Sequence, residues 1–129
     1  MATKPETPEL KPLEWVGTSR ANLASFPATV RKELGHALHL AQAGERPRQA
    51  KPLRGFGGAG VLELVESHEG NAYRAVYTVK FDKAVFILHA FQKKSKRGIA
   101  TPKADIELIK RRLRIAAETY HRLYGSNQP

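Results

Sequence analysis

The chain has 129 residues, a length that fits one domain with a single core, and 41% of its residues are hydrophobic, which is enough to fill that core. Its 22 Lys and Arg residues outnumber 12 Asp and Glu, and the net charge of +10 indicates a polyanionic partner such as nucleic acid, an anionic membrane surface or an acidic protein. Cysteine is absent, which excludes disulfides, thiolate zinc sites and cysteine nucleophiles.

The first residues of the chain differ from a folded segment in composition. Residues 1–12 hold three of the eight prolines and show no hydrophobic periodicity. We expect a flexible arm there, a single domain over residues 13–125 and a short tail at 126–129. No stretch resembles a secretory signal or approaches the ~20 apolar residues of a membrane span. We therefore expect a cytoplasmic protein that does not contact a membrane.

The first predicted elements of the domain are a strand at 13–17 and a short helix capped by Thr18 or Ser19. A longer helix begins around Pro27 and ends at Gly44. The segment 45–60 contains prolines, glycines and four basic residues, and we predict a basic loop. The core-facing stripe of the longer helix is predicted from its helical spacing to be Val30, Leu34, Ala37, Leu38 and Ala41.

Three runs at 61–66, 72–81 and 84–91 are rich in β-branched and aromatic residues, and turn signals at 69–71 and 82–83 separate them. Short links of this kind favour an antiparallel meander. Because side chains alternate along a strand, Arg74 is predicted to point away from the face of Tyr77. That other face is predicted to contain Tyr73, Ala75, Tyr77, Val79 and Phe81.

A last helix is predicted to open at Thr101 and Pro102 and to end at Gly125. The fold class is thus α+β, with two N-terminal helices and a C-terminal helix packed on a small, mainly antiparallel sheet in the order strand-helix-helix-strand-strand-strand-helix. The buried stripe of the last helix is predicted to be Ile106, Ile109, Leu113, Ala116, Tyr120 and Leu123.

Basic residues are concentrated between positions 93 and 114, where nine of them stand against two acidic residues. Such a positive face binds backbone phosphates and releases their counterions. The alternative is a solvated helix face, which applies most strongly to 110–114, whereas 93–97 follows a strand end, where binding groups are often displayed. The nine are Lys93, Lys94, Lys96, Arg97, Lys103, Lys110, Arg111, Arg112 and Arg114.

Arg74 is a separate candidate because it lies in the middle of a predicted strand, which holds a guanidinium rigidly. Rigid donors stabilise the negative charge that develops in a phosphoryl transition state, since they need no reorganisation. The alternative is a cross-strand ion pair with an acid such as Glu63.

Other catalytic patterns are weak. His36 and His39 share a helix but lack a third ligand at metal spacing, and His89 is more typical of a core or cleft residue, although it stays a minor candidate base. The glycines at 55–60 have neither the preceding strand nor the following Lys-Ser or Lys-Thr of a phosphate loop. We expect no metal and no cofactor.

Three motifs occur in order along the chain: KPLRG at 51–55, YRAVY at 73–77 and HAFQKK at 89–94. With them, residues 12–123 resemble the phage-derived, HigB-like branch of the RelE/HigB/ParE toxin superfamily. The resemblance implies a toxin of a type II toxin–antitoxin system that cleaves messenger RNA, usually on the ribosome. It also implies a cognate antitoxin, often of the helix-turn-helix type, as partner.

By position, the resemblance assigns phosphate and transition-state contact to Arg74 and assistance at the leaving oxygen to Lys93 or Lys94, with Arg54 completing the catalytic set. RNA binding falls to Lys51, Lys96, Arg97 and Lys103. The chain departs from many relatives in two ways: ELVE at 63–66 lacks their arginine, and the C-terminal tyrosine or histidine of relatives has only Tyr120, His121 and Tyr124 as counterparts. No general acid or base is assigned.

Two alternatives remain open. One is a ParE-like DNA gyrase inhibitor, which binds its target and cleaves nothing; the basic cluster after the last strand argues against it. The other is a nucleic-acid-binding module without activity, which the charge alone would explain.

Overall fold

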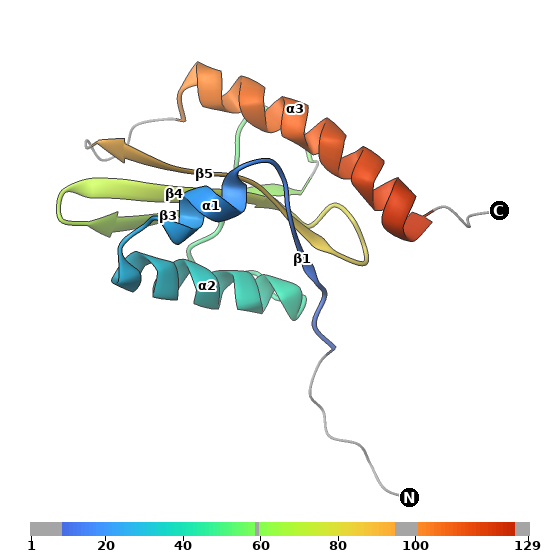
Figure 1. Ribbon diagram of the computed structural model, residues 1–129, viewed down its shortest axis with the longest axis horizontal. Helices are drawn as coiled ribbons and strands as arrows, with labels where there is room; N and C mark the ends of the chain where they lie inside the picture. Colours follow the sequence, from blue (N-terminus) through green and yellow to red (C-terminus); the bar gives the residue numbers. More distant parts are fainter. Residues whose placement is uncertain (1–8, 59, 95–100, 126–129) are drawn as a thin grey trace, which may run out of the picture.

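The computed structural model describes residues 9–58, 60–94 and 101–125 and contains a five-stranded sheet with helices on both faces (Figure 1). The strand order is β1-β5-β4-β3-β2. The first strand runs parallel to β5 and the other pairs are antiparallel, which confirms the predicted α+β class with a mainly antiparallel sheet. The strands are β1 (Leu13–Trp15), β2 (Lys51–Pro52), β3 (Val61–His68), β4 (Asn71–Thr78) and β5 (Val85–Lys94).

The helices form two layers around the sheet. In Figure 1, α1 and α2 lie on one side of it and α3 on the other. The bounds are α1 (Ser19–Ala24), α2 (Ala28–Gln42) and α3 (Lys103–Tyr120), and a π-helical turn, η1 (His121–Gly125), continues α3. No helix in the described ranges is both long and apolar enough to span a bilayer.

Each face of the sheet has its own core. The predicted stripe of α2 is buried throughout and packs with Tyr73, Ala75 and Tyr77 of β4. On the other face, Ile109 and Ala116 of α3 pack on side chains that include Val61, Val76, Phe86 and Leu88. Alternation along β4 therefore sends Arg74 to the α3 face, away from Tyr77 as predicted.

The predicted turn between β3 and β4 is a tight hairpin. Glu69 and Gly70 both have positive φ, 49° and 83°, the backbone that matches the right-handed twist of two antiparallel strands. Glu69 is the one described residue other than glycine with this geometry. The hairpin fixes the register in which Val65 lies opposite Arg74.

Three predictions about element bounds were wrong. The loop predicted at 45–60 contains β2, an edge strand in which Pro52 is tolerated. The central strand ends at Thr78, whose hydroxyl accepts a hydrogen bond from the Lys80 amide, so Phe81 turns into the core under α3. In the last helix, Leu123 lies beyond α3, in η1, and is 52% exposed.

Candidate nucleic-acid interface

On the α3 face, the helix packs over Val76 and the rows toward Phe86, whereas the edge strand β2 and the rows toward the β3–β4 hairpin are less covered. Residues that are paired across neighbouring strands point to the same face of the sheet, so the strand register identifies the side chains on the less covered part of this face. Lys51, Val65 and Ser67 are exposed there, and Lys93 is partly exposed. We call this surface the open face; it comprises Lys51, Glu63, Val65, Ser67, Ala72, Arg74, Phe91 and Lys93.

Arg74 lies at the centre of the open face but is only 7% exposed. Its Nη1 donates a hydrogen bond of 3.1 Å to Oε2 of Glu63, the acid that the sequence offered as an alternative partner. The same carboxylate oxygen accepts a hydrogen bond of 2.8 Å from the hydroxyl of Thr101, which lies just before α3. Arg74 is therefore held rigidly, as its strand position predicts, but its charge is paired in this arrangement.

Two lysines flank the Arg74–Glu63 pair. Lys51 lies opposite Glu63 in β2 and is exposed, and Lys93 lies opposite Ala72 in β5, one row beyond Arg74. Lys93 and Arg74 lie on neighbouring strands, offset by one row, so they are about 7–8 Å apart, whereas Lys51 lies two strands from Arg74. The open face thus presents ammonium groups on both sides of a buried guanidinium.

The other predicted residues do not all join this surface. Arg54 is exposed, but it follows β2 at the end of the sheet where β3 pairs with Thr78 of β4. Lys93 pairs with β4 six residues away from Thr78, so the two levels are about 20 Å apart at the usual strand rise. Lys103 is exposed in the first turn of α3. Lys94 ends β5, and Lys96 and Arg97 lie outside the described residues.

His89 and Asp105 form a contact that sequence reasoning missed. The histidine Nε2 lies 2.8 Å from Asp105 Oδ1, and its ring stacks on Phe91 at 4.5 Å between centroids. Burial lowers the pKa of His89. The carboxylate of Asp105 acts in the opposite direction, and the positive charge of Arg112 lowers the pKa further. The pair joins the first turn of α3 to β5, and the 6% exposure of His89 keeps it from serving as an accessible base here. The two residues are sixteen positions apart on different elements, so no motif connected them.

Arg112, counted within the basic cluster, is a structural cation instead. Its Nη1 donates to the Leu88 carbonyl at 3.0 Å and its Nη2 to the Thr18 hydroxyl at 3.2 Å, and burial lowers its pKa. Gly17, with φ +58°, lies directly beneath it, since a Cβ there would come within 2.7 Å of the guanidinium. The basic cluster therefore does not act as one solvated face.

The C-terminal tyrosines lie at the opposite end of the sheet from Lys93. The Tyr124 hydroxyl donates a hydrogen bond of 2.6 Å to the carboxylate of Glu14, and this bond raises the pKa of Tyr124 to about 12. Glu14 is paired with Phe86 of β5. The Tyr120 hydroxyl accepts from the Lys83 amide. Neither therefore reaches the open face. Among the described residues, no group of three His, Asp or Glu side chains could hold a metal ion.

Comparisons with known proteins agree with this architecture. Residues 21–114 match the family model described as phage derived protein Gp49-like. The structure of a mutant of the Escherichia coli toxin RelE in the free state covers 80% of this chain and 98% of its own, with a TM-score of 0.55 and 22% identity. The Mycobacterium tuberculosis RelBE2 toxin–antitoxin complex is less similar, with a TM-score of 0.47, 22% identity, and coverage of 66% of this chain and 100% of that one.

No curated protein matches the chain in sequence. The family match spans most of the domain, and the likeness to RelE is one of fold. The first confirms the phage-derived family and the second the RelE-like fold that the resemblance implied. The chain therefore belongs to the family of phage-derived Gp49-like proteins, and its domain has the RelE fold.

Proposed function

We propose that the protein is the toxin of a type II toxin–antitoxin system and that it cleaves messenger RNA on the ribosome without a metal. The observation that carries the proposal is the open face, where Lys51 and Lys93 flank a rigid arginine on a RelE fold. The net charge of +10 supports a polyanionic substrate. A cognate antitoxin, of the helix-turn-helix type, is the proposed second partner, and the cytoplasm is the proposed location.

The proposed reaction needs little covalent chemistry from the protein. The RNA 2′-hydroxyl loses its proton to water as its oxygen attacks the adjacent phosphorus. The bond from phosphorus to the 5′-oxygen breaks, and that oxygen takes up a proton from water, leaving a cyclic phosphate and a 5′-hydroxyl. The nucleophile belongs to the substrate, so the protein contributes orientation of the nucleotide and stabilisation of the extra negative charge.

Burial of Arg74 divides the proposed roles. Because Arg74 is paired with Glu63 and Lys51 and Lys93 are at least partly exposed, the two lysines are the proposed phosphate contacts, and Lys93 is proposed to stabilise the negative charge on the leaving oxygen. Arg74 acts as a positioning residue that fixes Glu63 and Thr101, unless a phosphate displaces the carboxylate from it. Arg54, Lys94, Lys96, Arg97 and Lys103 extend the contact along the RNA.

Induced expression in a bacterial host, followed by mapping of messenger-RNA 5′ ends, tests the proposal. We expect growth arrest with cuts at fixed codon positions, and strong loss of both in Lys93→Gln and Lys51→Gln. Lys32→Gln, an exposed lysine on α2 across the sheet, should behave as the parent.

Three other outcomes would contradict the proposal. A DNA damage response with intact messages would indicate gyrase inhibition, and nucleic-acid binding without arrest would indicate a binding module. Full arrest in the Lys51→Gln, Lys93→Gln double variant would show that the open face is not the site.

A further inference from the structure

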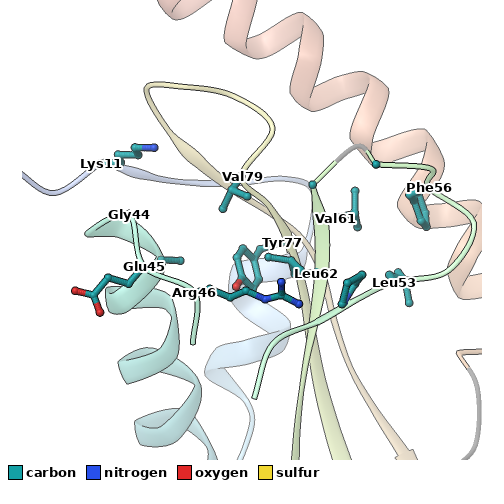
Figure 2. Close-up of a pocket in the computed structure, with 14 residues that line it drawn as sticks. Lys11, Gly44, Glu45, Arg46, Leu53, Phe56, Val61, Leu62, Tyr77 and Val79 are labelled. Atoms are coloured by element: carbon teal, nitrogen blue, oxygen red, sulfur yellow. The ribbon is translucent and has the colours of Figure 1, made fainter. Parts of the chain in front are cut away.

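A cavity of about 550 Å³ lies at the other end of the sheet, between the end of α2 and the loop after β2 (Figure 2). Ligand pockets for small organic molecules are usually about 300–1,000 Å³, so its size is suitable. Its walls are mainly apolar and come from several elements. They include Leu53, Phe56, Val61, Leu62 and Val79.

Tyr77 places a polar atom against this apolar wall. The residue is 0% exposed, and its hydroxyl has no hydrogen-bond partner among the residues that the structure describes. Figure 2 shows the hydroxyl end of the ring turned toward the Arg46 side chain. Burial raises the pKa of Tyr77 to about 12, although Arg46 opposes the rise, so the hydroxyl stays a proton donor at neutral pH. A buried donor of this kind destabilises a fold unless something accepts from it.

The charges around the cavity favour a monoanion. Lys11 and Arg46 contribute two positive charges and Glu45 one negative charge. Arg46 is exposed, and its Nη2 donates to the Ala50 carbonyl at a long 3.4 Å, so the guanidinium is free to turn toward a ligand. Its planar fork matches the two oxygens of a carboxylate.

The cavity is separate from the open face. The cavity wraps around the end of the sheet: Tyr77 and Leu62 belong to the core under α2, and Leu53, Phe56 and Val61 to the core under α3. Arg74 also points to the α3 face, but it does not line the cavity. Lys51 and Arg54 neighbour the lining residues Pro52 and Leu53 in the chain, but neither of the two basic residues lines the cavity. This site therefore goes beyond the proposed function and does not rest on it.

We infer that this cavity binds a small carboxylate with an apolar, aromatic-sized body. The carboxylate accepts hydrogen bonds from the Tyr77 hydroxyl and the Arg46 guanidinium. The body of the ligand packs against Leu53, Phe56 and Val79.

Calorimetric titration of the full chain with hydrocinnamate tests the site, with hydrocinnamide as the neutral probe of the same shape. We expect saturable binding of the acid and affinity at least about tenfold lower for the amide. Tyr77→Phe, which keeps the ring, and Arg46→Gln should each lower the affinity for the acid by about tenfold or more. Arg48→Gln is the matched control, because Arg48 is exposed and does not line the cavity.

Absence of saturable hydrocinnamate binding would overturn the inference, as would equal affinity for acid and amide, or unchanged affinity in both Tyr77→Phe and Arg46→Gln. Arg46 is exposed, so its variant keeps the test valid if Tyr77→Phe fails to fold. The titration contains no RNA. Failure of the ribonuclease proposal would therefore leave this result unaffected, and the converse also holds.

Discussion

Burial determines what the charged groups of the open face can do. Arg74 and Glu63 have side chains that are 8% and 12% exposed, so their contact lies in a medium of lower dielectric than water. Attraction between the two charges is stronger there, but each has lost hydration. The pair therefore stabilises the packing of β3 and β4 against the start of α3 more than an exposed pair could.

A double-mutant cycle measures that contribution. With Glu63→Gln and Arg74→Met, we expect a coupling energy of about 1–3 kcal/mol in the free energy of unfolding by urea. The exposed pair Lys110–Glu107, at 3.9 Å with side chains 43% and 53% exposed, is the control and should couple by less than about 0.5 kcal/mol. Equal coupling in the two cycles would show that the Arg74–Glu63 contact is screened like a surface pair.

His89 predicts a dependence of stability on pH. Burial holds its pKa below the ordinary value of 6.5, so as the pH falls the unfolded chain takes up the proton before the folded one does. The stability that neutral His89 contributes is complete above pH 6.5 and declines as the pH falls below it. Urea unfolding at about pH 7.5 and about pH 5.5 should show this loss in the parent and a smaller loss in His89→Gln.

The comparison between parent and variant isolates His89 from the other titrating groups. His39→Gln changes an exposed histidine on α2 and should keep the dependence of the parent. An identical loss in the parent and in His89→Gln would show that His89 does not control stability in this range.

At the scale of elements, α3 is held by one side of the helix. Ile109 is fully buried against the sheet, whereas Ile115, six residues later, is 47% exposed. Ile109→Ala leaves a cavity and should lower the free energy of unfolding by about 2–5 kcal/mol. Ile115→Ala removes the same atoms from a site largely in water, and we expect a change within about 0.5 kcal/mol. Urea denaturation compares them, and equal losses would contradict the packing of α3.

Periodic elements were predictable from the sequence, and short or irregular ones were not. The stripe of α2 and the alternation of β4 extend over enough residues for burial to impose a period on the sequence. β2 has two residues, which is too short for a period, and its pairing with β3 depends on a partner distant in the chain. The exposure of Leu123 follows from the π-helical turn, which rotates it out of the stripe of α3.

The sequence predicted which strands contribute residues to the candidate site, but it did not predict which of the charged residues are paired. Alternation placed Arg74 on the correct face, and pairing with Glu63 was one of its two possible roles. The sequence contains nothing that distinguishes a pair at 3.1 Å from a free guanidinium. Arg112 was likewise inseparable from its solvated neighbours, because its partners are a carbonyl of β5 and the Thr18 hydroxyl.

For the whole molecule, charge and its placement make separate predictions. A net charge of +10 favours any polyanion, wherever the lysines lie. Binding to one face instead depends on the lysines that contact phosphates there. Each phosphate contact to single-stranded RNA steepens the fall of log affinity with log salt by about 0.7.

Salt titration of RNA binding therefore distinguishes the two cases. Lys51→Gln with Lys93→Gln removes two contacts proposed on the open face, and the slope should become shallower by about 1.4. Lys32→Gln with Lys83→Gln removes the same charge from exposed positions away from that face, on α2 and beyond the end of β4, and should leave the slope near that of the parent. The measurement is fluorescence anisotropy of a labelled single-stranded RNA over a range of KCl concentrations. If the two double variants reduce the slope of log affinity against log salt equally, RNA binding depends on net charge alone and the open face is not the interface.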